Sequence, residues 1–264
     1  MENLLEIKDL KVQFSVGKQV ITAVDGAYLS IAKSETVVLA GESGSGKTVT
    51  ALAVTRILPP YAKVISGSIR FKARELLTLD EKSLQRVRGK EIAYIFQEPT
   101  SFLNPVYTVG NQIAEAIILH QNKTRIEACR EAEHLLALVK INNPQRVMGD
   151  YPHQLSGGMN QRVFIAMSLA CKPSLLIADE PTTALDVTIE ARILELLCDL
   201  KKELGFSLLF ITHNFSIAKK IADKIFIMYA GKTVEEGDKD AIFSSPRHFH
   251  TKELIAAYEK IGKI

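Results

Sequence analysis

The sequence predicts an α/β fold with a mainly parallel sheet, preceded by an antiparallel β region. Three observations support this prediction. Short apolar runs suited to buried strands alternate with amphipathic helical segments, which is the pattern of a parallel sheet with helical crossovers. A glycine- and serine-rich loop joins the first such run to a helix. The N-terminal stretches instead alternate imperfectly between apolar and polar residues, which is typical of antiparallel strands with one solvated face.

Each predicted element has a local signal. The run at 36–40 is apolar and β-branched, as expected of a strand buried on both faces. The helix after the glycine-rich loop is expected to end at Pro59-Pro60, because proline cannot continue a helix. Gly205 suits the left-handed position that follows a helix. In chain order, the expected strands cover 4–14, 20–31, 36–40, 174–178, 206–211 and 224–229, and the other expected helices cover 124–140 and 188–204.

The composition fits one globular domain over residues 1–264, with subregions. Apolar residues make up 47% and charged residues 24%, proportions that exclude a disordered or collagen-like chain. The net charge of +3 is too close to balance for a protein that coats nucleic acid. No apolar run approaches the roughly 20 residues that span a bilayer. Three cysteines without CxxC spacing argue for a reducing compartment and against a disulfide framework or a zinc site.

The strongest local motif is a P-loop, GxxxxGK[ST], with a strand before it and a helix after it. Its glycines let backbone N–H groups surround phosphates, and the helix N-terminus adds its positive dipole end. A lysine can neutralise the β- and γ-phosphates, and a threonine hydroxyl can bind Mg²⁺. The alternative, a glycine-rich turn without a ligand, does not explain the full spacing. The motif predicts binding of ATP or another nucleoside triphosphate with Mg²⁺, through Gly41, Glu42, Ser43, Gly44, Ser45, Gly46, Lys47 and Thr48.

A pair of carboxylates ends the apolar run at 174–178. Asp179 and Glu180 are adjacent, and strand alternation points adjacent side chains in different directions. We therefore expect Asp179 to hold the magnesium shell and Glu180 to act as the general base toward water. The alternative is an ordinary strand-end turn with two solvated acids.

A third element, Leu155-Ser-Gly-Gly-Met-Asn-Gln-Arg162, opens a predicted helix with Ser156 as its N-cap. With Gly157 and Gly158 it forms a second helix N-terminus suited to an anion. The alternative is a glycine-containing loop before a core helix.

Together these motifs resemble the ATP-binding-cassette (ABC) ATPases, in the right order and over essentially the whole chain. The resemblance implies a P-loop NTPase (RecA-like) fold with an antiparallel β subdomain and a helical subdomain inserted at roughly 98–165. It implies that Phe14 stacks on adenine, although a core aromatic would fit that position equally well. Gln97 matches the glutamine that senses magnesium and water, and His213 the switch histidine at the γ-phosphate. Residues 183–186, ending in Asp186, match the D-loop, and 155–161 the signature.

In that family, the signature of one subunit caps the γ-phosphate in the P-loop of another. The resemblance therefore implies a dimer with a second ABC ATPase subunit. Strings such as 151–159, 179–188 and 228–232 are similar to the ATPase subunits of oligopeptide, dipeptide and nickel importers. The resemblance implies two membrane permeases and an extracytoplasmic solute-binding protein as partners, no nucleic acid, and a place on the cytoplasmic face of the membrane.

The sequence departs from the importer pattern at four positions that carry no phosphate or magnesium group. Asn160 stands where arginine is usual, and Asn214 where an aspartate follows the histidine. Phe249 replaces a proline, and Ser34 replaces a glycine before Glu35.

The segment between Gln97 and Gln112 is expected to receive a permease helix through Phe102, Leu103, Val106 and Tyr107; these side chains could equally pack the helical subdomain. A second hypothesis is a soluble ABC-type ATPase that acts on nucleic acid or ribosomes. A third is an unrelated P-loop kinase or GTPase. The interval of about a hundred residues between P-loop and signature argues against the second, and the absence of a guanine-reading [NT]KxD string argues against the third.

Overall fold

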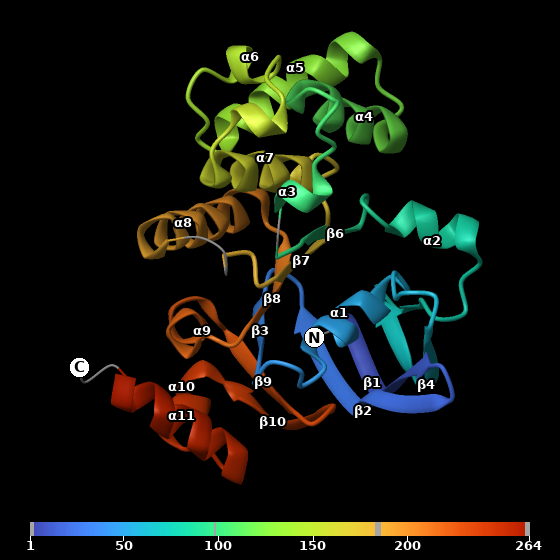
Figure 1. The fold of residues 1–264 in the computed structure, drawn as a ribbon, viewed down its shortest axis with the longest axis vertical. Coiled ribbons are helices and arrows are strands. Elements are labelled where there is room, and N and C mark those ends of the chain that lie inside the picture. Colours follow the sequence, from blue (N-terminus) through green and yellow to red (C-terminus); the bar gives the residue numbers. More distant parts are fainter. Residues whose placement is uncertain (1–2, 98, 183–185, 262–264) are drawn as a thin grey trace. The chain divides into compact units, whose positions relative to one another are not determined.

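A computed structural model describes residues 3–97, 99–182 and 186–261 of the chain (Figure 1). The chain divides into two compact units. The first unit comprises Met1–Leu84 and Ser207–Ile264, and the second comprises Gln85–Phe206. Helix α2 (Glu81–Val87) runs across the boundary in the sequence. Each unit is described by itself.

The antiparallel region of the first unit is a sheet in the order β2-β1-β4-β5. Strand β1 (Asn3–Val16) pairs with β2 (Gln19–Ala32) on one side and with β4 (Ala62–Phe71) on the other. The short β5 (Arg74–Glu75) adds to β4. Apolar side chains of β1, among them Leu5 and Ile7, are buried. The predicted antiparallel strands are confirmed.

The other strands of the first unit form a mainly parallel set in the order β10-β9-β3-β8. Strand β3 (Thr36–Ala40) runs parallel to both β8 (Ser207–Thr212) and β9 (Lys224–Tyr229), and β10 (Lys232–Asp238) returns antiparallel to β9. Every residue of β3 and β8 is buried, as the apolar runs predicted. The helices of this unit are α1 (Lys47–Val54), α9 (Phe215–Ile221), α10 (Lys239–Ser244) and α11 (Phe249–Ile261).

The end predicted for α1 was wrong. The helix stops at Val54, several residues before Pro59-Pro60, and Arg56 adopts a left-handed φ of 55°. The Arg56 guanidinium donates a hydrogen bond to the carbonyl of Leu79 at 2.6 Å. This contact to a residue distant in the sequence favours the turn that ends the helix.

The second unit combines a parallel strand pair with helices. Strand β6 (Ile92–Ile95) pairs with β7 (Leu175–Asp179). Figure 1 shows α4 and α5 lying over α7, and the three helices contact one another. No helix among the described residues is long and apolar enough to span a membrane. The helices are α3 (Pro99–Phe102), α4 (Val109–Gln121), α5 (Arg125–Leu138), α6 (Pro144–Val147), a 3₁₀ turn (Pro152–Gln154), α7 (Gly157–Leu169) and α8 (Val187–Leu204).

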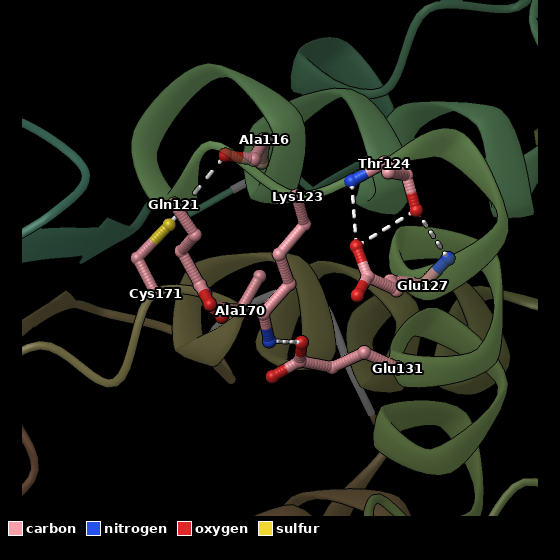
Figure 2. Close-up of polar contacts among 8 residues, drawn as sticks. All are labelled: Ala116, Gln121, Lys123, Thr124, Glu127, Glu131, Ala170 and Cys171. Atoms are coloured by element: carbon pink, nitrogen blue, oxygen red, sulfur yellow. Dashed lines mark hydrogen bonds and ion pairs between the residues drawn. The ribbon is translucent and has the colours of Figure 1, made fainter.

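Polar contacts fix the connection between α4 and α5 (Figure 2). Thr124 caps α5 in a capping box, because its hydroxyl accepts from the N–H of Glu127 while the Glu127 carboxylate accepts from the N–H of Thr124. Lys123 and Glu131 form an ion pair beside this cap. The Gln121 amide donates to the carbonyl of Ala170 at 2.6 Å, which ties α4 to the end of α7. The helix predicted at 124–140 is confirmed over Arg125–Leu138, and the structure identifies Thr124 as its N-cap.

Candidate functional site

The P-loop residues follow the carboxyl end of β3 and extend into the first turn of α1, which begins at Lys47, as predicted. Two glycines are required there by close backbone approaches. At Gly41 a Cβ would lie 2.2 Å from the carbonyl oxygen of Met228. At Gly46, with a φ of 101°, a Cβ would lie 2.7 Å from the carbonyl oxygen of Ala23. The loop can follow this path only without side chains at these positions.

The polar groups of the P-loop are arranged for an anion. Lys47 is only 5% exposed, and its Nζ donates to the carbonyls of Gly41 at 2.9 Å and Glu42 at 2.7 Å. Helix α1 begins without a side-chain cap at Gly46, so no side chain takes up its first N–H groups at that position. The buried Ser45 hydroxyl oxygen has no hydrogen-bond partner among the described residues. Buried donors of this kind at a helix N-terminus match the oxygens of a phosphate.

His213, the predicted switch histidine, lies at the same edge of the first unit as the P-loop. Ala40 and Thr212 are register partners on the parallel strands β3 and β8, so Gly41 and His213 both follow the carboxyl ends of these strands. The His213 side chain is exposed. The next residue, Asn214, caps α9 by accepting from the N–H of Ser216 at 2.9 Å.

Phe14 lies near the end of β1, opposite Ile21 and Ala62. It is half-buried, and its ring contacts the Tyr61 ring with centroids 5.8 Å apart and planes tilted by 55°. Ile21, the register partner of Phe14, is two residues from Ala23 along β2. The carbonyl oxygen of Ala23 lies beside Gly46, so Phe14 lies near the place where the P-loop approaches this sheet.

The acidic pair lies in the second unit at the end of β7. Asp179 is 7% exposed, whereas Glu180 is half-buried and adopts a left-handed φ of 45°. A non-glycine residue in this region is uncommon, and such conformations concentrate at functional sites. Ile95 and Ala178 are register partners, so the exposed Gln97 follows β6 at the same edge as the acidic pair. The structure therefore groups Gln97, Asp179 and Glu180 within one unit.

The signature residues begin α7. Ser156 is its N-cap, and its hydroxyl accepts from the N–H of Met159 at 3.4 Å, as predicted. Ser156 and Gly157 are exposed. At Gly158 a Cβ would lie 3.1 Å from Ile189, and Ile189 donates its N–H to the capping carboxylate of Asp186 at 2.9 Å. The starts of α7 and α8 are thus packed together. Thr183, Ala184 and Leu185 of the D-loop lie outside the described residues.

Residues 24–183 match the family model described as ABC transporter. The chain belongs to the ABC transporter family.

Relatives of this ABC protein include the glutathione import ATP-binding protein GsiA of Escherichia coli strain K12 and that of Shigella flexneri. Each is 47% identical over 266 residues, which cover 98% of this chain and 43% of the relative. The chain therefore spans less than half the length of these curated relatives.

Solved structures of ABC cassettes share the fold and confirm the predicted class, a P-loop α/β protein with an antiparallel β region and helices. The ATP-binding cassette MJ0796, a dimer in a post-hydrolysis state bound to ADP and Pi, has a TM-score of 0.79 and 27% identity, over 93% of this chain and 100% of that one. CbiO1 from Clostridium perfringens, part of the transporter complex cbiONQ, has a TM-score of 0.79 at 24% identity, over 100% of this chain and 98% of that one. At this identity the likeness to CbiO1 shows the fold alone.

Two residues at the end of the signature string, Gln161 and Arg162, have surroundings that the motif alone did not predict. Gln161 is fully buried, and neither its amide oxygen nor its amide nitrogen has a hydrogen-bond partner among the described residues. The guanidinium of Arg162 donates to the carbonyl of Val139 at 2.7 Å, and its burial, together with the charge of Arg192, lowers its pKa. No local pattern distinguishes a buried glutamine of this kind from an exposed one on a helix.

Proposed function

We propose that this chain is the ATP-hydrolysing subunit of an ABC importer, in which ATP binding closes a dimer of cassettes and hydrolysis reopens it. The observation that carries this proposal is the anion-binding geometry of the P-loop. Lys47 is buried against the loop carbonyls, the Ser45 hydroxyl is buried without a partner among the described residues, and no side chain caps α1 at Gly46. These groups can neutralise and hydrogen-bond the phosphates of ATP.

The residues present also fit Mg²⁺. The ion prefers oxygen ligands and usually keeps phosphates and waters in its shell. Thr48, Gln97 and Asp179 supply a hydroxyl, an amide and a carboxylate oxygen. When bound, Mg²⁺ would neutralise charge on the β- and γ-phosphates.

In this mechanism Lys47 holds the terminal phosphates and Glu180 accepts a proton from the attacking water. The left-handed backbone of Glu180 separates its direction from that of Asp179, so the two carboxylates can take different roles. His213 would donate a hydrogen bond to the γ-phosphate, and Gln97 would orient water. Gln97, Glu180 and His213 follow the carboxyl ends of parallel strands, and Lys47 begins the helix after the P-loop. Ligands bind at this edge in open α/β sheets.

The second ATPase subunit would complete each site. Ser156, Gly157 and Gly158 present an exposed helix N-terminus that suits the γ-phosphate held by a partner's P-loop. The dimeric state of the cassette MJ0796 supports this arrangement.

Two membrane permeases would dock on the second unit. Val106 is 73% exposed and Tyr107 52%, while Phe102 is half-exposed and stacks on Phe96 at 4.2 Å. Leu103 instead is buried. Phe102 and Leu103 therefore pack the segment into its own unit, while Val106 and Tyr107 are exposed and available to a partner. This supports both the packing role and the docking role of the segment.

The transported solute is proposed to be a peptide or nickel. The name of the GsiA relatives supports the peptide class, because glutathione is a tripeptide. An extracytoplasmic binding protein would deliver the solute, and the chain would lie at the cytoplasmic face of the membrane.

The test is Glu180→Gln in the purified cassette. Loss of the general base should lower ATP turnover by about 10²- to 10⁴-fold while ATP binding persists and a closed dimer accumulates. Glu195→Gln, on an exposed position of α8, is the matched control. Hydrolysis near the wild-type rate in Glu180→Gln would remove Glu180 from this role, and absence of ATP binding by the wild type would refute the proposed function.

A further inference from the structure

An aromatic corner, defined by Phe14 and Tyr61, stands at one end of the antiparallel sheet in the first unit. The corner is fixed by the backbone. Phe14 is the register partner of Ala62, and the N–H of Ser15 donates to the carbonyl of Tyr61 at 2.8 Å. The ring centroids are 5.8 Å apart and the planes are tilted by 55°. Tyr61 is 55% exposed, so its second face is open to solvent or to a ligand.

The same sheet contacts the P-loop close to this corner. The Ala23 carbonyl lies against Gly46, and Ala23 stands between Thr22 and Val24 on β2. Phe14 pairs with Ile21, two residues along β2 from Ala23. At about 3.3 Å per strand residue, the Phe14 position is about 7 Å along the strand from the point where the P-loop touches it. A nucleotide with its phosphates in the P-loop carries its ribose and base outward over a distance of this order.

We propose that Tyr61 is a second wall of the base site, in addition to Phe14. The inference rests on the proposed binding of ATP. Two rings tilted by 55° cannot both lie parallel to one base, so they divide the contact. Phe14, nearer the P-loop strand, stacks on the face of the purine, and Tyr61 contacts its edge, since tilted edge contacts between aromatic rings are favourable. Tyr61 thereby limits how far the base can move away from Phe14.

The chain contains no tryptophan, so single tryptophans can report on each wall. Phe14→Trp and Tyr61→Trp are titrated in the full chain with MgATP and, separately, with inorganic tripolyphosphate, which occupies a P-loop but has no base. The control is Ile65→Trp, an exposed position on β4. We expect MgATP to change the emission at positions 14 and 61 with the same midpoint, tripolyphosphate to leave both unchanged, and position 65 to respond to neither.

A second measurement tests the contribution to affinity. Tyr61→Ala should weaken MgATP binding about three- to tenfold and leave tripolyphosphate binding unchanged, because one aromatic edge contact is lost. Tyr61→Phe should restore wild-type affinity, since the ring edge remains.

The outcomes separate the inference from the function on which it rests. A MgATP response at position 14 with none at position 61, or unchanged affinity in Tyr61→Ala, overturns the role of Tyr61 while ATP binding stands. Absence of any MgATP binding by the wild-type chain overturns both.

Discussion

Replacing Gln112 by alanine should detach the segment proposed to dock the permeases from its support without touching the residues proposed to bind the nucleotide. Gln112 lies in the first turn of α4 and is 9% exposed. Its side chain holds Asn104 and Tyr107 through three hydrogen bonds. Oε1 accepts from the N–H of Asn104 at 2.8 Å, and Nε2 donates to the carbonyls of Asn104 at 3.0 Å and Tyr107 at 2.9 Å. The amide thus fixes the backbone that presents Val106 and Tyr107.

The size of the effect follows from these three bonds. Each hydrogen bond contributes about 0.5–1.5 kcal/mol net, and a buried group left without a partner costs about 1–3 kcal/mol. The three bonds together therefore contribute about 1.5–4.5 kcal/mol. The freed carbonyls lie in an exposed loop where water can reach them, so we expect the lower part of this range, about 1.5–3 kcal/mol. Since about 1.4 kcal/mol is a factor of ten, the ordered loop should be depopulated about ten- to 140-fold relative to the wild type.

The assay compares the isolated cassette with the complex. Gln112→Ala should keep the ATPase activity of the isolated cassette, and should lose about tenfold or more in affinity for the permeases and in ATP-driven uptake. Gln121→Ala is the matched control, because it deletes the same amide on the same helix, where it bonds the Ala170 carbonyl instead. Wild-type permease affinity in Gln112→Ala, or an equal loss in Gln121→Ala, would show that the loop support does not govern docking.

Two further changes probe stability. Thr124→Ala removes the hydroxyl half of the capping box with Glu127 and should lower the free energy of unfolding by about 0.5–2 kcal/mol, while Thr124→Ser should not; unchanged urea midpoints would contradict this. Glu235→Gln tests the pH dependence of stability. Burial alone would raise the pKa of the Glu235 carboxyl. The hydrogen bonds that this carboxylate accepts, including those from the N–H groups of Arg247 and His248, outweigh burial and lower the pKa below 4.5. Because the pKa of this carboxyl is lower in the folded chain than in the unfolded chain, the carboxylate stabilises the fold at any pH above the pKa of the unfolded chain. This stabilisation is lost as the pH falls through the pKa of the folded chain. The urea midpoint of the wild type should exceed that of the variant near neutral pH, and the gap should close below about pH 4.5; a gap that does not change with pH would contradict this.

Elements with a strong local pattern could be predicted from the sequence. The run at 36–40, the P-loop and the helix-end residues Ser156 and Gly205 all depend on residues close together in the chain, and the structure reproduces them. Helix α4 was not predicted, although its buried face follows helical spacing at Val109, Ile113 and Ile117.

Local sequence patterns could not predict conformations that depend on contacts between residues distant in the chain. The early end of α1 is accompanied by the bond from Arg56 to the carbonyl of Leu79, a residue distant in the sequence. The left-handed backbone of Glu180 and the contact between Phe14 and Tyr61 have no counterpart in the periodicity of the chain. Such features can be found only once the strands are paired, because strand register decides which side chains meet.

Two departures from the importer pattern, at Ser34 and Asn214, show the same difference between contacts to distant residues and contacts to near neighbours in the sequence. Ser34, in place of a glycine, has a left-handed φ of 61°, and its N–H donates to the Ser207 hydroxyl at 2.8 Å, a tertiary bond that holds the backbone in this conformation. Asn214, in place of an aspartate, still caps α9 through its side-chain oxygen. Asparagine and aspartate are nearly equivalent as N-caps, because either supplies the acceptor that the first free N–H groups require. The substitution removes a negative charge beside His213 while keeping the backbone that positions it. At position 214 an uncharged side-chain oxygen is therefore sufficient to cap α9 directly after His213.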